Sequence, residues 1–533
     1  MRPRHHVITA IPGGGPGRPS GAGGRRGAAL AVHALVLALV ASLGAAGCAP
    51  ASRRTPDDTL VVVIESGVNT VDPRFALSSW ESKISRLVAA GLTSVDTADL
   101  RPRLNLAERM VAVDDHTTDL TLRPDARFSD GSPVTAHDVV ATFESVLAPD
   151  SKSLHHKGFA ERYVRLEVLG ERVVRIHQKE PLATLGSDLD FGVLSKTGLG
   201  AGPYALRELT STHVLLEVNP YYFGPRPRTP RVEIKIVRDA AARLLMLVGG
   251  SADLLQNSVR MDLIEVVRGR PRVQIAENQS VILTYFMFNT ADPLLRDVRV
   301  RKAIALALDR PAIVAAKFGG HARLATGLLP EIHWAYSGDV PRYDHDLPRA
   351  RALLDAAGYP DPDGAGPRPR MKLVYKTSSD AFRIAVARVI GAQLAEVGIE
   401  VELRSFEFAT FFADVKKGSF QLASMQTNEL NEPDFYYFYF HSSRIPDARD
   451  PDGGNRWRYR NPEIDRLTAA GRRELDPVKR KALYAEVQRI VAEDVPIVAL
   501  WHEDNLAMAN ADLQGYLMTP NARLGGLASA WKR

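Results

Sequence analysis

The sequence predicts a mixed α/β protein with more than one sheet and several lobes. The chain has 533 residues, of which 45% are hydrophobic and 24% are charged, as in ordinary globular proteins. At about 150 residues per domain, this length suggests two to four lobes. Strand-like and helix-like patterns alternate along the chain without a fixed period, which excludes a solenoid.

The amino-terminal segment has the pattern of a secretory signal. Residues 1–27 are rich in Gly, Pro and Arg, and an apolar run, 28–43, follows and contains His33. This run of 16 residues is shorter than the ~20 that a membrane-spanning helix needs. Small residues, 44–47, lead to Cys48. A basic stretch, a short apolar stretch and small residues together predict a signal peptide over 1–47.

Cys48 is the only cysteine, so no intrachain disulfide can form. Its position resembles that of the acylated cysteine of bacterial lipoproteins, although Ala45 stands where that signal usually has Leu. The alternative is a plain signal peptide with an incidental cysteine. We predict lipidation at Cys48, an acylated tether over 48–56, and a location in the periplasm or at the cell surface, with a lipid anchor in a membrane.

The net charge of +6 comes mostly from the amino terminus. The first 48 residues hold five arginines and no acid, so the rest of the chain has 63 Lys and Arg against 62 Asp and Glu. A nearly neutral body offers no general attraction for phosphate backbones, and we predict no nucleic-acid partner.

Local patterns predict the elements of the mature chain. Thr135 with Asp138 resembles a capping box and opens a helix that stops before Pro149. Further helices are predicted to begin at Asp309, Asp346 and Asp476, and a long one covers 382–397. Strands are predicted at 60–64, 119–123, 173–176, 214–218, 232–236, 371–375 and 399–403.

The sequence lacks the common catalytic and metal-binding motifs. His502-Glu503 has no second histidine to complete a zinc-protease motif, and no phosphate loop or serine nucleophile elbow is present. The glycines of 198–202 precede Pro203 and a strand, which favours a backbone turn over a dinucleotide loop. Residues 361–364 are interpreted as a surface loop, not a calcium loop. We therefore predict no catalytic residue, no metal site and no cofactor.

An acidic and aromatic segment is the strongest candidate for binding. Six consecutive aromatic residues, 435–440, follow the polar stretch 428–434. In an extended conformation, half of the rings would pack inward and half could line a cleft. Carboxylates beside aromatic walls suit a ligand with an ammonium group. The alternative is a strand buried on both sides. A second cluster, 457–460, could contact a ligand or form a surface loop.

Several sequence segments follow one another in an order that matches a known family. The most specific is LTLRPDARFSDGSPVTAHDVVATFESVL at 120–147. The others lie at 69–73 with 90–92, 100–110, 198–206, 218–224, 288–310, 350–359 and 483–501. Together they resemble the extracellular solute-binding proteins, family 5, of peptide and nickel ABC importers. The resemblance covers nearly the whole mature chain, from about Val61 to Leu500.

The resemblance implies a periplasmic-binding-protein-like fold, with two main lobes joined by hinge crossovers and an extra third lobe. Lobe I would comprise 57–90, 196–285 and 497–533. The extra lobe II would comprise 91–195, and lobe III 286–496. Ligand would be trapped when the lobes close.

The resemblance also implies a binding role without catalysis. Glu429, four residues before Pro433, would pair with the ammonium group of a short peptide. The predicted ligand-binding set is Glu429, Asn431, Asp434, Tyr437, Trp457 and Asn69. Arg449, Arg456 and Arg458 are candidates for the ligand carboxylate. The implied partner is an ABC transporter permease, and the protein is expected to be a monomer.

Other functions remain open at this stage. The same fold could bind a nickel or other metal chelate, haem, a glycan or an opine. A secreted hydrolase, or a sensor or chaperone without transport, is a further alternative.

Overall fold

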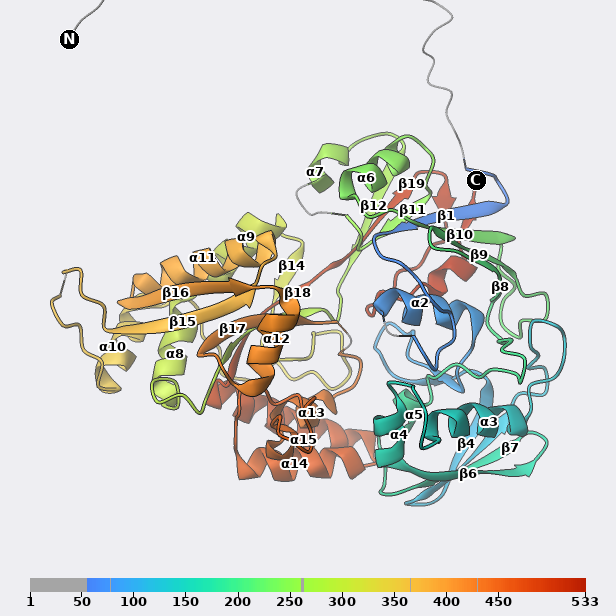
Figure 1. The fold of residues 1–533 in the computed structure, drawn as a ribbon, viewed down its shortest axis with the longest axis horizontal. Helices are drawn as coiled ribbons and strands as arrows, with labels where there is room; N and C mark the ends of the chain where they lie inside the picture. Colours follow the sequence, from blue (N-terminus) through green and yellow to red (C-terminus); the bar gives the residue numbers. More distant parts are fainter. Residues whose placement is uncertain (1–54, 77, 260–262, 365, 429) are drawn as a thin grey trace, which may run out of the picture. The chain divides into compact units, whose positions relative to one another are not determined.

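The computed structural model describes residues 55–533 apart from 77, 260–262, 365 and 429. The predicted signal peptide and Cys48 lie outside the described residues. Within the described part, no helix is both long and apolar enough to cross a bilayer. Three larger sheets, of seven, six and four strands, organise the chain, so the predicted mixed α/β class is confirmed (Figure 1).

The seven-stranded sheet is built around β1 (Thr59–Ile64), whose residues are all buried. β1 pairs in parallel with β10 and β11. Its side chains alternate between two cores: Val62 packs with residues of α2, and Val63 packs with residues of α6 and α7. The strand order is β12 (Val273–Asn278), β19 (Asn505–Asn510), β11 (Leu254–Gln256), β1, β10 (Arg231–Ile236), β9 (His213–Val218) and β8 (Tyr204–Leu209); the helices are α2 (Ser79–Val88), α6 (Ala240–Val248) and α7 (Ile264–Val267).

The six-stranded sheet has helices on both faces. Phe286 and Phe288 of its strand β13 pack against α8 to α11, while Tyr285 and Met287 pack against α12 to α15. The strand order is β14 (Ala322–Leu324), β18 (Ile497–Glu503), β13 (Leu283–Phe288), β17 (Leu422–Thr427), β15 (Met371–Ser378) and β16 (Ile399–Phe406). The helices are α8 (Val298–Ala307), α9 (Arg310–Phe318), α10 (Leu347–Ala356), α11 (Ala381–Ala395), α12 (Phe408–Lys417), α13 (Phe435–Phe440), α14 (Pro462–Arg473) and α15 (Pro477–Asp494).

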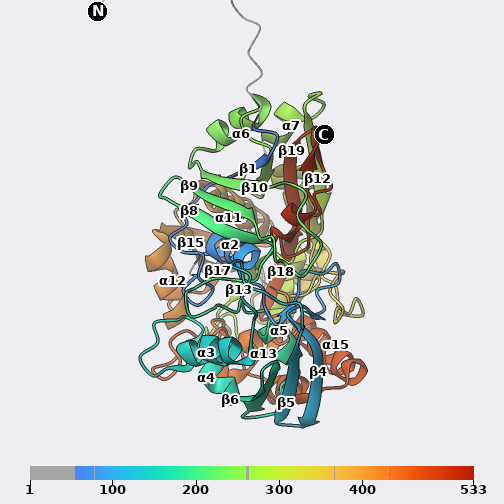
Figure 2. The same cartoon turned by 90° about the vertical axis from the view of Figure 1, so that its right-hand side faces the viewer.

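The four-stranded antiparallel sheet forms a separate layer with its own core, and we call it, with its helices, the four-stranded lobe. Phe143 and Phe159 stack at 5.3 Å between the sheet and its helices. In both views this lobe lies beside α15 (Figures 1 and 2). The strand order is β4 (Ala107–Asp114), β5 (Thr117–Leu122), β7 (Val173–Gln178) and β6 (Tyr163–Gly170), with α3 (Ala136–Leu147), α4 (His156–Arg162) and α5 (Leu185–Asp188).

Short elements complete the described chain. They are the pairs β2 (Thr93–Ser94) with β3 (Arg103–Leu104) and β20 (Leu513–Gln514) with β21 (Trp531–Lys532), and the 3₁₀ turns Ser442–Arg444 and Gly525–Ala528.

Two neighbouring segments carry the chain between the seven- and six-stranded sheets. One joins β12 to β13, and the other, Asp504, joins β18 to β19. They lie side by side, because the Glu503 N–H donates to the Ile282 carbonyl at 3.1 Å and the Ser280 hydroxyl donates to the Glu503 carbonyl. Both β13 and β18 belong to the six-stranded sheet, whereas the sequence-based lobe limits fall at 285 and 497. Strand pairing is non-local, so a local pattern does not specify it.

The predicted elements with strong local signals are confirmed. The Thr135 and Asp138 capping box opens α3, and Asp309 caps the start of α9 as predicted. The 198–202 glycines form a loop against α2, where a Cβ on Gly200 would come within 2.2 Å of the Val88 carbonyl oxygen. Close backbone approach therefore explains these glycines.

Candidate functional site

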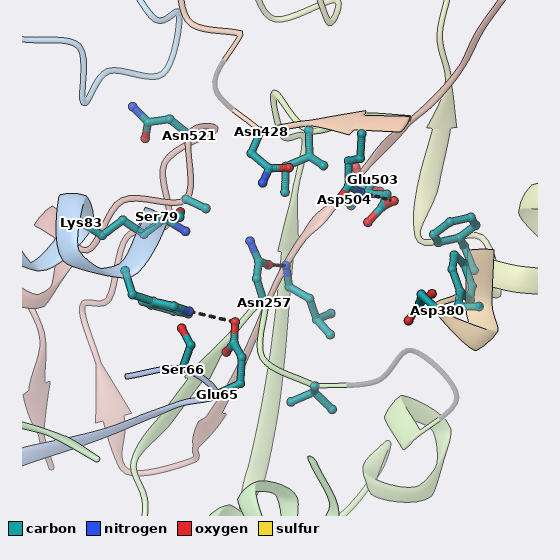
Figure 3. A pocket seen from close by; sticks show the side chains of 18 of the residues that line it. Glu65, Ser66, Ser79, Lys83, Asn257, Asp380, Asn428, Glu503, Asp504 and Asn521 are labelled. Atoms are coloured by element: carbon teal, nitrogen blue, oxygen red, sulfur yellow. Dashed lines mark hydrogen bonds between the residues drawn. The ribbon is translucent and has the colours of Figure 1, made fainter. Parts of the chain in front are cut away.

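A cavity of about 1060 Å³ lies where elements of the seven- and six-stranded sheets meet (Figure 3). Polar residues reach the cavity because several strands end and helices begin at its edge. β1 ends before Glu65, β11 ends before Asn257, and β18 ends at Glu503. The cavity is therefore next to the crossing segments. Its walls come mainly from Glu65–Ser66, Ser78–Trp80, Lys83, Asn257, Ala316–Phe318, Asp380–Phe382, Gln426, Asn428, Glu503–Asp504 and Asn521–Ala522.

The wall beside the seven-stranded sheet combines a carboxylate with an indole ring. Ser78 caps α2 and so fixes Trp80 in its first turn. Trp80 Nε1 donates to Glu65 Oε1 at 2.8 Å, while Glu65 Oε2 is buried and has no hydrogen-bond partner among the described residues. The Lys83 ammonium lies 4.8 Å from the Trp80 ring centroid. This wall therefore carries a positive and a negative charge on an aromatic surface.

The wall beside the six-stranded sheet carries further carboxylates. Glu503 Oε1 accepts hydrogen bonds from Thr284 Oγ1 at 3.1 Å and from Gln426 Nε2 at 2.6 Å. Burial raises the pKa of Glu503, and the positive charge of Arg383 opposes part of that rise. Asp504 accepts from Arg323 Nε at 3.0 Å, and burial also raises its pKa.

The rest of this wall is aromatic. The Phe318 and Phe382 rings meet edge to face with centroids 5.4 Å apart. Asp380 caps α11 by accepting from the Arg383 N–H at 2.9 Å. The side chains of Asp380 and Glu503 both border the cavity (Figure 3).

This arrangement suits a small charged organic molecule. The volume is that of a ligand pocket, and the walls mix apolar rings with charges of both signs. Among the described residues, no group of three or more His, Cys, Asp or Glu side chains could hold a metal ion.

The sequence-predicted site residues lie mostly elsewhere. Glu429 is outside the described residues, although its neighbour Asn428 lines the cavity. Asp434 is buried and pairs with Arg472 at 3.2 Å. Asn69 is exposed, and its backbone N–H donates to Glu81 at 2.9 Å. Neither Asp434 nor Asn69 borders this cavity.

Tyr437, Trp457 and Asn431 are not in its walls either. The Arg472 guanidinium lies 4.1 Å from the Tyr437 ring. Trp457 is fully buried in the core below α13, 5.6 Å from the Tyr439 ring. Asn431 Oδ1 is buried, with no hydrogen-bond partner among the described residues. The described members of the predicted set thus do not line this cavity.

The aromatic segment corrects one prediction. Residues 435–440 form the helix α13, not an extended strand. Rings four residues apart stack, Phe435 on Tyr439 at 6.0 Å and Tyr436 on Phe440 at 5.6 Å. The β-preference of aromatic residues is overridden because Tyr436, Tyr439 and Phe440 bury their rings together in the core.

The three arginines proposed for the ligand carboxylate also lie away from the cavity. Arg449 is exposed beside Asp447. Arg456 lies 4.9 Å from the Phe412 ring, and Arg458 donates to the Lys416 carbonyl at 2.8 Å.

Sequence reasoning missed Glu65, Lys83, Asp380 and Glu503. One signal could have indicated Glu65: ligands bind at the carboxyl ends of parallel strands, and Glu65 directly follows the buried strand β1. Glu503 was considered only as part of an incomplete zinc motif.

Comparison with known proteins identifies the family of this chain. The model of the bacterial extracellular solute-binding proteins, family 5 (Middle), matches residues 101–447. The chain belongs to this family. It is 26% identical to the probable D,D-dipeptide-binding periplasmic protein DdpA of Escherichia coli, over 88% of this chain and 93% of the relative. It is 25% identical to the oligopeptide-binding protein AppA of Bacillus subtilis, over 86% and 88%.

Solved structures share the fold. AppA of Bacillus subtilis, in complex with a nonapeptide, superposes with a TM-score of 0.72 at 24% identity, covering 89% of this chain and 99% of that one. NikZ of Campylobacter jejuni, in complex with Ni(L-His), gives a TM-score of 0.76 at 22% identity, covering 90% and 100%. The two structures contain different ligands.

Proposed function

We propose that this protein captures short peptides in the cavity and delivers them to the permease of an ABC importer. The observation behind this proposal is the composition of the cavity, which offers carboxylates, ammonium groups and aromatic walls to one small ligand. A peptide has an ammonium group for the carboxylates, a carboxylate for the ammonium groups and an apolar frame for the aromatic walls. The peptide-binding relatives, similar over most of both chains, support this choice of ligand.

Glu429 is proposed to pair with the ligand ammonium group. It follows Asn428, which lines the cavity. Peptide main chain would be held by strand-like hydrogen bonds, and side chains by roomy, hydrated pockets. Affinity would then depend on the termini and the backbone of the peptide.

The crossing segments are proposed to act as the hinge. Ser280–Ile282 and Glu503–Asp504 are short, lie side by side and border or adjoin the cavity. A few residues that absorb backbone rotation suffice for closure of two lobes. The division into lobes I, II and III is part of this proposal, with the limits between lobes I and III moved to the crossing segments because β13 and β18 pair in the six-stranded sheet.

Outside the described residues, we propose that Cys48 is lipidated and tethers the protein to a membrane, and that the mature protein is a monomer. A periplasmic location agrees with the name of the Escherichia coli relative.

Calorimetry tests the function. Purified protein is titrated with Ala-Ala-Ala, with its N-acetylated form and with Ni(II)-histidine. We expect Ala-Ala-Ala to bind, and acetylation to weaken binding by about 10-fold or more because a charge-assisted hydrogen bond is lost. Binding of the nickel complex with no response to a set of short peptides would contradict the proposal and favour the chelate alternative.

A further inference from the structure

A loop attached to the four-stranded lobe reaches into the core beside the six-stranded sheet. Residues 95–102, which we call the strap, join β2 to β3. The base of this hairpin is held by the four-stranded lobe, because the Thr93 hydroxyl donates to the Gly186 carbonyl of α5 at 2.6 Å. Leu100 of the strap is fully buried and belongs to the core cluster of β13 and α12 to α15. Among the described residues, the other buried members of this cluster all come from 281–499.

Leu100 holds an unfavourable backbone conformation. Its φ is 62°, in the left-handed region that residues with a Cβ rarely adopt. The Leu100 N–H donates to the Thr97 carbonyl at 3.4 Å, and the Thr97 hydroxyl donates to the Arg101 carbonyl at 3.0 Å. The Arg101 guanidinium lies 5.6 Å from the ring of Trp334, which packs against the same core cluster. Such strain persists only where the surroundings compensate for it, and here burial of the leucine side chain does so.

The chain does not run directly from the strap to the core that holds Leu100. It enters the four-stranded lobe after α2 and leaves it before β8, and both elements pack in the seven-stranded sheet's core. The six-stranded sheet connects to the seven-stranded sheet through the crossing segments, 279–282 and 504. Rotation about this proposed hinge therefore moves the strap relative to the core around Leu100. Withdrawal would expose the leucine side chain to water, which is unfavourable.

Exposed charge pairs cross the same junction. Lys157 of α4 lies 2.6 Å from Asp450, and Glu180, which precedes α5, lies 2.7 Å from Arg473 of α14. Water and salt replace such exposed pairs at little cost. The junction thus combines the apolar Leu100 contact, which opposes separation, with charge pairs that separate easily.

We propose that the strap is a latch, in which burial of Leu100 favours the closed state and so raises the affinity for ligand. This inference rests on the proposed function, because it assumes closure about the crossing segments. Leu100 does not line the cavity, so its effect on affinity is indirect. The apparent affinity of a ligand that binds the closed state is proportional to the population of that state.

Small-angle X-ray scattering and calorimetry test the latch. Leu100→Asn removes the apolar side chain and keeps a residue that tolerates positive φ. We expect the ligand-free variant to have a larger radius of gyration than wild type, and saturation with Ala-Ala-Ala to remove the difference. Its affinity for Ala-Ala-Ala should fall by about 5-fold or more. Leu104→Asn is the matched control, because Leu104 is an exposed leucine of the same hairpin, and it should change neither quantity.

The double variant Lys157→Glu/Glu180→Lys probes the same junction from its surface. It places like charges opposite Asp450 and Arg473 on exposed side chains, where folding is not at risk, and it should also enlarge the ligand-free protein. An unchanged radius of gyration in folded Leu100→Asn would overturn the latch. If that variant does not fold, an unchanged radius in the charge-reversed variant overturns it instead. A wild-type protein that binds no peptide would overturn the proposed function, while scattering from the ligand-free variants still decides the latch.

Discussion

Arg480 in α15 provides the sharpest test of how the four-stranded lobe is held against the rest of the chain. Its side chain is buried, and the guanidinium pairs with Glu432, donates to the Gly471 carbonyl at 3.0 Å and reaches the Ala183 carbonyl at 3.4 Å. Glu432 also accepts from Ser187 Oγ at 2.8 Å. Ala183 and Ser187 belong to the four-stranded lobe, so one buried ion pair joins two parts of the structure.

Arg480→Met keeps the aliphatic stem and removes the charge. Burial already raises the pKa of Glu432, and the Arg480 charge is the strongest influence opposing that rise. Without Arg480 the carboxylate is buried and unpaired. Loss of one partner of a buried pair lowers the free energy of unfolding by about 3–5 kcal/mol, more than a typical substitution.

Urea denaturation followed by tryptophan fluorescence measures this loss. The double variant Arg480→Met/Glu432→Gln should be more stable than Arg480→Met alone, because it leaves no buried unpaired charge. Arg489→Met, which removes an exposed arginine of the same helix, is the control and should leave the urea midpoint unchanged. A loss below about 1 kcal/mol in Arg480→Met, or strictly additive effects in the double variant, would refute this reasoning.

Three further predictions concern the proposed roles and the response to acid. Glu429→Gln should weaken binding of free-amine peptides by about 1.5–3 kcal/mol, and calorimetry with an N-acetylated peptide should show no difference between variant and wild type. Cys48→Ser should move the protein from the membrane to the soluble fraction, and its persistence in the membrane would indicate another anchor. Burial lowers the pKa of His333 to about 3 and that of His502 to about 4. An unfolded histidine takes up its proton at about pH 6.5, whereas these buried histidines stay neutral to a lower pH. The contribution of each histidine to the free energy of unfolding is therefore full above about pH 6.5. It falls by about 1.4 kcal/mol per pH unit below that, until the folded pKa is reached. When the melting temperature is plotted against pH from about 7.5 to 4.5, it should therefore fall less steeply for His502→Gln than for wild type. Equal slopes would contradict the histidine origin of the acid sensitivity.

Elements with local signals were predictable from the sequence. The Thr135 and Asp138 pair closes a capping box within four residues, and Asp476 with Pro477 starts α15 as expected. In these cases the atoms that stabilise the element are close in sequence. The run of Val and Ile in β1 likewise predicted a buried strand, and all six of its residues are buried.

The 435–440 segment shows where such reasoning ends. Its composition favours a strand, yet it is the helix α13. The deciding contacts come from Trp457 and Tyr484, which follow later in the chain. A local pattern contains no information about partners that arrive by folding.

The sequence by itself determined the mixed α/β class, most helix starts and the resemblance to family 5 solute-binding proteins, because these depend on short-range patterns. The tertiary structure alone decided which side chains face one cavity. Glu65 and Glu503 are more than four hundred residues apart, and they line opposite walls of one cavity only because β1 and β18 end at the junction of two sheets. Strand pairing over such separations is set by the packing of whole layers, which no single stretch of sequence specifies.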